Sequence, residues 1–318
     1  MFYLAIKKNM KILHISDLHF CKKFKRENIV KTKKLLKKAF ENSFDHLVIT
    51  GDISDNSNPE DFQLLKSILI NFGLYNSEKT TIIIGNHDIF GGVQTAFDII
   101  NFPQKCSMIN YSEKVELFFN NFKELFDNVR FLDSNSPFPF IKIVNDIVFI
   151  GMNTILKYSK LKNPFASNGK IDNLTLFQVS KELTQSIYSG KKKILLTHHH
   201  FYKNKEHAHS SNSNNTWNKI ESFTLKLRGK KRVFRFMKEN NIELVLHGHS
   251  HEIRSYNRKG IQFLNAGASV DNFSKDSFAY LINIILNDIT FQRVSLINTN
   301  NINSTLQLDI SNELEVLK

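Results

Sequence analysis

The residues of this chain that could do chemistry lie in five short motifs, each rich in Asp, Asn or His. The motifs are, in order, Asp17-Leu18-His19, Gly51-Asp52-Ile53-Ser54-Asp55, Gly85-Asn86-His87-Asp88, His198-His199-His200 and Gly248-His249-Ser250-His251. Each motif follows an apolar run with β-branched residues. Together they offer enough oxygen and nitrogen ligands for two metal ions that share one carboxylate. Metal ions in such a pair can activate water for attack on a phosphate ester.

The candidate ligands mix oxygen and nitrogen donors and include no thiolate. They are Asp17, His19, Asp52, Asn86, His198, His249 and His251. Such a set suits manganese, iron, zinc, cobalt or nickel, as two divalent or mixed-valence ions, and suits calcium less well. Two ions held about 3.5–4 Å apart need a ligand that touches both. A carboxylate can do this with its two oxygens, whereas an imidazole cannot easily, so we predict that Asp52 is the bridging ligand.

A strand has to bring each motif to the same place. We predict strands over residues 11–16, 46–50, 80–84, 192–197 and 243–246, each ending at one of the motifs. Further strands are predicted near 139–151, 261–265, 277–285 and 288–295, and helices over 27–43, 59–72, 113–125, 174–188 and 229–240. Alternating strands and helices predict a largely parallel sheet, in which ligands bind beyond the carboxyl ends of the strands. Residues far apart in the sequence can therefore converge at that edge.

The order of the motifs resembles a known pattern. The series DxH, GDxxD, GNHD, a later His and GHxH, over roughly residues 10 to 270, is similar to that of the calcineurin-like metallophosphoesterase superfamily. The resemblance implies an α/β fold, a four-layer αββα sandwich of two mixed sheets, with a dinuclear metal site at the carboxyl ends of the strands. The compact build, with GNHD and HGHSH, looks most like the bacterial cyclic-nucleotide phosphodiesterase-like members.

The same resemblance implies roles for the motif residues. One metal ion would be held by Asp17, His19, Asp52 and His251, and the other by Asp52, Asn86, His198 and His249. His87 would protonate the leaving oxygen or stabilise the transition state, and Asp55 would orient His87. The implied reaction is metal-dependent hydrolysis of a phosphate monoester or diester, with a hydroxide that bridges the two metal ions as the nucleophile.

One position departs from the family pattern. Many relatives have a proline two positions after the ligating histidine, and here that position is His200. Because a proline would stiffen the turn, we expect other contacts to hold His198. His199 or His200 would contact the substrate or only fill space. For the remaining histidines we predict packing or hydrogen-bonding roles at His14, His46 and His247, and solvated roles at His207 and His209.

Two other functions remain open at this stage. One is a DNA-repair-type nuclease of the same superfamily, since His-Ile-Ser-Asp-Leu-His at residues 14–19 also resembles such enzymes. Those enzymes carry a further region for a partner ATPase, for which little sequence remains beyond residue 300. The other is a catalytically silent scaffold. Silent members lose ligands or the catalytic histidine, whereas every expected position is filled here.

The charge of the chain favours an anionic partner. The net charge is +13, from 43 basic and 30 acidic residues among 318. Such an excess attracts phosphorylated substrates, although a solvated basic surface explains it equally well. The basic segments 22–26 and 226–235 could steer a polyanion, and a solvated face is the better-supported interpretation for both. Because no nucleic-acid-binding module is visible, we favour a phosphorylated anionic substrate over nucleic acid.

We predict one domain over residues 10–297 and a polar C-terminal tail over 298–318. Residues 1–9 precede a first strand that is already complete from Met10 onward. The two cysteines, Cys21 and Cys106, are too few for a disulfide framework and fit a reducing compartment, so a cytoplasmic location is predicted. No apolar run reaches about 18 residues, so no transmembrane segment is expected. The polar segment 203–219 would form a rim over the metal site or a plain surface excursion.

Overall fold

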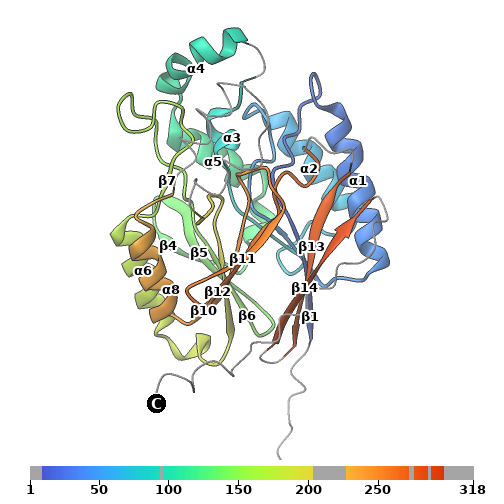
Figure 1. Cartoon of the computed structure of the whole chain (residues 1–318), viewed down its shortest axis with the longest axis vertical. Coiled ribbons are helices and arrows are strands. Elements are labelled where there is room, and N and C mark those ends of the chain that lie inside the picture. The colour runs from blue at the N-terminus through green and yellow to red at the C-terminus, as the bar shows by residue number, and fades with distance from the viewer. Residues whose placement is uncertain (1–8, 94–95, 203–226, 272–275, 286–287, 297–318) are drawn as a thin grey trace, which may run out of the picture.

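The structure is a computed structural model that describes residues 9–93, 96–202, 227–271, 276–285 and 288–296. Two β-sheets lie face to face, and helices cover their outer faces (Figure 1). This arrangement confirms the four-layer αββα sandwich of two mixed sheets. The predictions for residues 203–219 and for the tail from 298 lie outside the described residues.

The described helices alternate with strands along most of the chain. The helices are α1 (Arg26–Glu41), α2 (Pro59–Asn71), α3 (Asn86–Phe90), α4 (Ala96–Met108), α5 (Tyr111–Asn121), α6 (Asn173–Leu183) and α8 (Lys230–Glu239), with the 3-10 helices η1 (Lys123–Phe126) and η2 (Ser186–Tyr188). The strands are β1 (Met10–Ile15), β2 (His46–Ile49), β3 (Thr80–Ile82), β4 (Arg130–Asp133), β5 (Ser136–Val144), β6 (Ile147–Gly151), β7 (Gly169–Lys170), β8 (Lys192–Leu196), β9 (Leu227–Arg228), β10 (Ile242–His247), β11 (Arg254–Arg258), β12 (Ile261–Asn265), β13 (Phe278–Ile285) and β14 (Asp288–Ser295).

Each of the two large sheets has a parallel part, and the first sheet has one antiparallel edge whereas the second has two. The first sheet has the order β14-β13-β1-β2-β3, and the second has the order β11-β12-β10-β8-β6-β5-β4. Strands β1, β2 and β3 are parallel, as are β12, β10, β8 and β6. The expectation of a largely parallel sheet therefore holds only for these parts. Strands covered on both faces can be parallel, whereas antiparallel pairs tolerate a solvent-facing side.

The core follows the alternation of side chains along the strands. In β8, Ile194 and Leu196 join the large cluster that contains the first sheet, whereas Leu195 packs with residues of α6 and α8. In β10 the same alternation sends Leu244 to the first cluster and Val245 to the second. Because successive side chains point to opposite faces, each strand of the second sheet serves two apolar layers.

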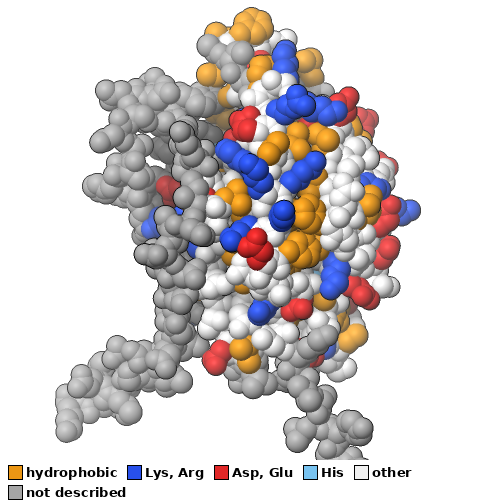
Figure 2. Space-filling view, turned by 90° about the vertical axis from the view of Figure 1, so that its right-hand side faces the viewer, with side chains coloured by type: hydrophobic (Ala, Val, Ile, Leu, Met, Phe, Trp, Pro, Cys, Tyr) orange, Lys and Arg blue, Asp and Glu red, His pale blue; other side chains and the backbone are white. Residues whose placement is uncertain are grey.

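The outer helices bury one face and leave charges in water. In α1, Leu35, Leu36 and Ala39 are buried, while most of its lysines are exposed. Figure 2 looks onto the side of the molecule that lies at the right of Figure 1, where basic, acidic and apolar side chains are interspersed. Helix α2 begins as its sequence directs, with the Asn58 side chain accepting a hydrogen bond from the N–H of Glu60 and Pro59 in the first position.

Six elements were not predicted from the sequence, namely α3, α4, β4, β7, β9 and β11. Helix α4 contains Pro103 in its interior, where proline is unfavourable, and leaves the apolar Phe97 and Ile100 exposed. Strands β4 and β11 lack an apolar run, and β11 exists because its polar residues pair antiparallel with β12. Among the described residues, no helix is both long and apolar enough to span a membrane.

Candidate metal centre

The motifs converge because five parallel strands end at the same edge of the sandwich. The predicted ligands lie as follows: Asp17 and His19 after β1, Asp52 after β2, Asn86 after β3, His198 after β8, and His249 and His251 after β10. The first three of these strands belong to the first sheet and the last two to the second. The site is therefore built jointly by the two sheets.

Five of the seven predicted ligands have a left-handed backbone. Their φ angles are 54° for Asp17, 45° for His19, 53° for Asp52, 76° for His249 and 52° for His251. Side-chain-bearing residues rarely adopt positive φ, and a run of such residues at one place marks a functional site. The sharp turns after the strands aim these side chains back across the sheet edge and toward one another.

Two glycines let the carboxylates approach the backbone. A Cβ on Gly85 would lie 2.1 Å from Asp52 Oδ1, and a Cβ on Gly248 would lie 2.2 Å from Asp17 Oδ2. Neither clash could be relieved cheaply, because each carboxylate is itself buried. These glycines in the third and fifth motifs are therefore required by close packing at the site.

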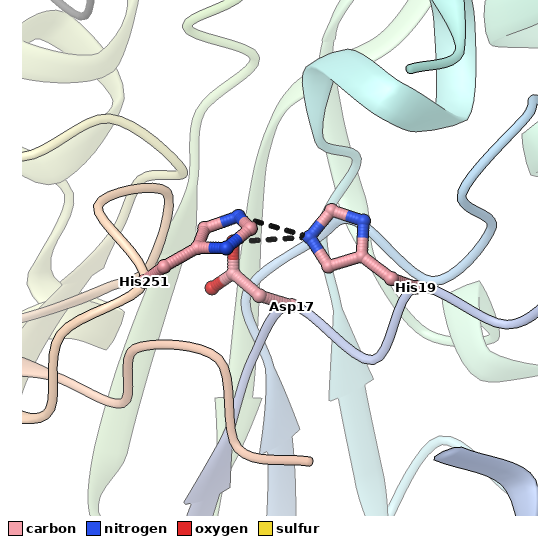
Figure 3. Close-up of side chains that lie close together, drawn as sticks. All are labelled: Asp17, His19 and His251. Carbon is pink, nitrogen blue, oxygen red and sulfur yellow. Dashed lines mark hydrogen bonds and ion pairs between the residues drawn. The ribbon is translucent and has the colours of Figure 1, made fainter. Parts of the chain in front are cut away.

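The first ligand group contains Asp17, His19 and His251 (Figure 3). His19 Nε2 lies 3.1 Å from His251 Nε2 and 4.0 Å from Asp17 Oδ1. The carboxylate of Asp17 also accepts a hydrogen bond from the backbone N–H of His249, at 3.0 Å. Asp17 and His19 are fully buried, whereas His251 is exposed, so the group is open to solvent on the His251 side.

The second ligand group contains Asp52, His198 and His249, with Asn86 beside it. His198 Nε2 lies 3.1 Å from Asp52 Oδ2, 3.0 Å from Asn86 Oδ1 and 3.2 Å from His249 Nδ1. The other ring nitrogen of His198 lies 2.8 Å from the carbonyl oxygen of Thr50. This backbone contact can hold His198 where the family pattern has a proline at position 200, in line with the expectation that other contacts would do so.

Asp52 lies between the two groups. Its Oδ2 atom is 3.1 Å from His198 Nε2 and 3.9 Å from His19 Nε2, so one oxygen faces a nitrogen of each group. Among the described residues Oδ2 has no hydrogen-bond partner, although the side chain is buried. Its Oδ1 atom accepts a hydrogen bond from the backbone N–H of His87, at 2.8 Å. The orientation of Asp52 is thus fixed through Oδ1, and Oδ2 remains available to ligands.

The second group suits a cation on the chemistry of its donors. The Thr50 carbonyl can only accept, so the neutral His198 ring carries its proton on Nδ1 and presents a lone pair at Nε2. That lone pair faces the Oδ1 of Asn86 and the Oδ2 of Asp52. Such acceptors face one another stably only with a proton or a metal ion between them. The thiolate-free set fits a first-row transition metal.

In the metal-free protein a proton can fill this place. Burial opposes the charged form of His198, yet the negative charge of Asp52 raises the pKa of His198 to about 9. Burial likewise opposes the charged form of Asp52, but His198, His87 and His19 hold the pKa of Asp52 well below its usual range. The two shifts have one cause, which is the attraction between the Asp52 carboxylate and the surrounding imidazoles.

His87 lies beside the first group. Its ring is edge-on to that of His19, with the ring centroids 4.5 Å apart. His87 Nδ1 lies 3.2 Å from the backbone oxygen of Asp55. Gly92 supports the other side of the ring, since a Cβ there would lie 2.6 Å from His87 Cε1. Burial lowers the pKa of His87, assisted by the charges of His19 and Lys25 and opposed by those of Asp52 and Asp55.

Asp55 contacts His87 in a different way from that implied by the resemblance. Its carboxylate Oδ1 is 3.8 Å from His87 Nδ1, but only 3.3 Å from His19 Nδ1 and 2.9 Å from Lys25 Nζ. The backbone oxygen of Asp55, and not the carboxylate, is the nearer partner of His87. The orienting role of Asp55 toward His87 stays a prediction, and the carboxylate has additional partners that motif matching did not indicate.

Asp88 has a structural role that the sequence analysis did not assign. Its carboxylate accepts hydrogen bonds from the backbone N–H groups of Asp52, Ile53, Ser54 and Gly85, at 2.8 to 3.0 Å. It therefore ties the second motif to the third. The available signal was an acidic residue in the first turn of the short helix α3, where backbone N–H groups are unpaired.

The neighbours of His198 in its motif differ from it in role. His199 uses both ring nitrogens, with Nδ1 2.7 Å from Thr154 Oγ1 and Nε2 3.1 Å from the carbonyl oxygen of Ser167. Burial lowers the pKa of His199 to about 3. His200 stacks on Tyr202, with ring centroids 4.2 Å apart. These contacts favour packing roles for both residues.

The histidines outside the motifs also have structural partners. Ring nitrogens lie within hydrogen-bond distance of Thr50 for His14, of Glu78 and Thr81 for His46, and of Tyr256 and Gly248 for His247. These contacts agree with the hydrogen-bonding roles predicted for the three residues. His207 and His209 lie outside the described part of the chain.

Comparisons with known proteins agree with this fold. The family model for calcineurin-like phosphoesterases matches residues 10–252, which include all five motifs. No curated protein matches the sequence. Purple acid phosphatase PPD1 from yellow lupin (Lupinus luteus) seeds is a similar solved structure, with 11% identity and a TM-score of 0.58. The match covers 93% of this chain and 53% of the lupin chain, so this chain spans about half the length of that phosphatase.

Other solved structures match with lower scores. A putative 5'-nucleotidase from Staphylococcus aureus, in complex with alpha-ketoglutarate, has 14% identity and a TM-score of 0.45 over 95% of this chain and 56% of that one. A predicted phosphoesterase from Streptococcus pneumoniae has 11% identity and a TM-score of 0.38 over 91% of both chains. At such identities the lupin phosphatase supports the fold alone, and the two lower-scoring matches support no further conclusion.

Proposed function

Because the chain belongs to the calcineurin-like phosphoesterase family, we propose that it hydrolyses a phosphate ester with two metal ions at the centre described above. The observation that supports this most directly is the position of Asp52 Oδ2 between His198 of one ligand group and His19 of the other. When bound, two metal ions there would supply a Lewis acid and would lower the pKa of water enough to give a nucleophile.

The two ligand groups suggest which residues hold each of the two ions. In this proposal Asp17, His19 and His251 hold one ion, and Asn86, His198 and His249 hold the other. Asp52 serves both. The backbone bond from His87 to Asp52 Oδ1 and the Thr50 carbonyl at His198 Nδ1 keep these two ligands oriented.

His87 is suited to assist the leaving group. Its Nδ1 faces a carbonyl oxygen, which can only accept, so the proton of the neutral ring lies on Nδ1 and Nε2 remains for the substrate. The side chain is 21% exposed, so a substrate can reach it. To act as an acid the ring must first take up a second proton, at Nε2, from solvent; in this proposal Nε2 then passes that proton to the leaving oxygen or donates a hydrogen bond to the phosphoryl group in the transition state.

The substrate we favour is a small phosphodiester or monoester. This choice rests on the resemblance to bacterial cyclic-nucleotide phosphodiesterase-like members and on the net charge of +13, which attracts anions. Both cysteines are buried and unpaired, which is compatible with the reducing, cytoplasmic location that we propose.

A panel assay tests the proposal. The purified protein would be loaded separately with manganese, iron, zinc, cobalt or nickel and assayed on an aryl phosphomonoester, an aryl phosphodiester and cyclic nucleotides. We expect two equivalents of bound metal and turnover of at least one ester. Metal binding without any turnover would favour a silent scaffold. Faster cleavage of single- or double-stranded DNA would favour a nuclease.

A further inference from the structure

Lys25 joins two carboxylates at the edge of the metal centre. Its Nζ atom lies 2.9 Å from Asp55 Oδ1 and 2.7 Å from Asp271 Oδ2. Lys25 comes directly before α1, Asp55 lies in the second motif, and Asp271 follows β12. A single ammonium group thus links three loops, namely the one before α1, the one after β2 and the one after β12.

This bridge differs from an ordinary surface ion pair. The side chains of Lys25, Asp55 and Asp271 are 24%, 1% and 20% exposed. Lys22, three residues earlier in the same basic segment, pairs with Glu60 at 3.1 Å, and these side chains are 58% and 66% exposed. Exposed pairs are screened by water and salt and contribute little, whereas a buried carboxylate depends on its partner. The two lysines therefore provide a matched comparison.

The bridge reaches a predicted metal ligand through Asp55. The Oδ1 atom that accepts from Lys25 also lies 3.3 Å from His19 Nδ1. The opposite ring nitrogen, His19 Nε2, points toward His251 and Asp17 in the first ligand group (Figure 3). A carboxylate at the far nitrogen of a metal-binding histidine fixes its ring orientation and raises its basicity. Asp55 Oδ1 lies on this side of the His19 ring, 3.3 Å from Nδ1, as a charge contact without a well-aligned hydrogen bond.

We propose that Lys25 and Asp271 are positioning residues, which hold Asp55 and through it orient His19 for the metal ion of the first ligand group. The inference rests on the proposed dinuclear function. In this proposal Asp55 orients His19 in addition to His87. The proposal also gives a function to Lys25, which belongs to the basic segment 22–26 that the sequence alone favours as a solvated face.

The effect should be confined to one metal ion. Among the described residues, Lys25 and Asp271 make no hydrogen bond or ion pair with Asn86, His198 or His249. Without the ammonium group, the Asp55 and Asp271 carboxylates would repel each other across the position that Lys25 occupies. Asp55 would then shift from His19, while the second ligand group would keep its Thr50 and His87 contacts.

The test uses Lys25→Met, Lys25→Arg and the control Lys22→Met in the full-length protein. After removal of metal with a chelator, each protein would be titrated with Co²⁺, and its visible absorption and metal content would be measured. For Lys25→Met we expect the affinity for one equivalent of Co²⁺ to fall about 10- to 100-fold, with the other equivalent unchanged. Arg at position 25 should restore affinity to within a few fold, and Lys22→Met should match the wild type.

A second variant keeps the test decisive if Lys25→Met folds poorly, as thermal denaturation would reveal. Asp271→Asn retains the Lys25–Asp55 pair, so it should lower the affinity for the same equivalent of Co²⁺ by a smaller factor than Lys25→Met does. Unchanged binding of both equivalents in Lys25→Met, or an equal loss in Lys22→Met, would overturn the positioning role. Failure of the wild-type protein to bind two equivalents would instead overturn the dinuclear function, and the positioning role with it.

Discussion

At the scale of single residues, Asp52 determines whether the centre can hold two ions. Its two oxygens have separate tasks, because Oδ1 accepts from the His87 backbone and Oδ2 faces His198 and His19. Among the described residues of the centre, Asp52 is the only carboxylate with an oxygen within 4.0 Å of a ring nitrogen of each ligand group. Removing it should therefore affect both ions at once.

The variant Asp52→Ala should lose activity and most of both metal equivalents. The physical reason is that four imidazoles, one amide and the Asp17 carboxylate remain, and the negative charge shared by the two ions is lost. Elemental analysis of the purified variant measures the loss. Asp45→Ala, at an exposed carboxylate whose Oδ2 accepts from the backbone of Lys11, is the control and should retain two equivalents. Two equivalents and normal turnover in Asp52→Ala would rule out the bridging role.

The variant His87→Ala should keep both metal ions and lose most of its turnover. His87 is not in either of the two proposed ligand groups, and general acid–base help is typically worth about 10²–10⁴-fold. The measurement is kcat on aryl esters of graded leaving-group acidity. Proton transfer to the leaving oxygen predicts a smaller loss with nitrophenyl esters than with alkyl esters. An equal loss across the series would indicate transition-state charge stabilisation, and an unchanged rate would remove His87 from the mechanism.

At the scale of elements, the two sheets are joined by a buried lysine. Lys142 of β5, in the second sheet, donates hydrogen bonds to the carbonyl of Thr80 in β3, at 2.7 Å, and to that of Leu125 in η1, at 3.0 Å. The side chain is 3% exposed. Burial lowers the pKa of Lys142 to about 7, although Asp127 opposes the shift. The contact between the sheets that carry the metal centre therefore includes a group that titrates near neutral pH.

This buried lysine should make stability depend on pH. Between about pH 7 and the pKa of a lysine in the unfolded chain, about 10.4, the unfolded state binds one more proton than the folded state. The free energy of unfolding should therefore rise with pH in this window, by up to about 1.4 kcal/mol per pH unit from this group. Urea denaturation at pH 7, 8 and 9 would measure the slope, which Lys142→Met should reduce. The exposed Lys123→Met is the control, and an equal slope in all three proteins would contradict the assignment.

At the scale of the whole molecule, the folded unit extends past the region that the family model matches. The match ends at residue 252, but β13 pairs antiparallel with β1 through five residue pairs, and β14 forms the sheet edge beyond it. Ile282 of β13 is fully buried. We propose that the domain runs from residue 10 to 297, as predicted from the sequence, with 298–318 as a separate tail.

Two truncations test this boundary. A chain ending at residue 297 should keep the melting temperature and metal content of the full protein. A chain ending at 276 would lose β13 and β14, expose the edge of β1 and uncover apolar side chains such as Ile282, so it should aggregate or unfold. Thermal denaturation and size-exclusion chromatography distinguish the two outcomes. A stable chain ending at 276, or loss of stability on removing 298–318, would move the boundary.

The sequence by itself predicted which residues could carry the chemistry and which strands would deliver them. Strand and helix signals are local, since they depend on apolar runs and caps such as Asn58-Pro59, and most predicted elements are present within a few residues. The donor types of the motifs are equally local. Their convergence followed because parallel strands bring their carboxyl ends to one edge.

Only the tertiary structure decided which partners these residues have. Strand β11 forms because it can pair with β12. Tertiary packing also brings Lys25 and Asp271 together and places Lys25 against Asp55. It positions the Asp88 carboxylate where it accepts hydrogen bonds from both the second and the third motif. His199 is adjacent to His198 in sequence, yet the turn after β8 directs it toward Thr154. Apart from the β11–β12 hairpin and the bond from Gly85 to Asp88, these contacts join residues separated by tens or hundreds of positions. Local sequence patterns cannot specify them, because they depend on where whole elements pack and on which polar groups burial leaves to be paired.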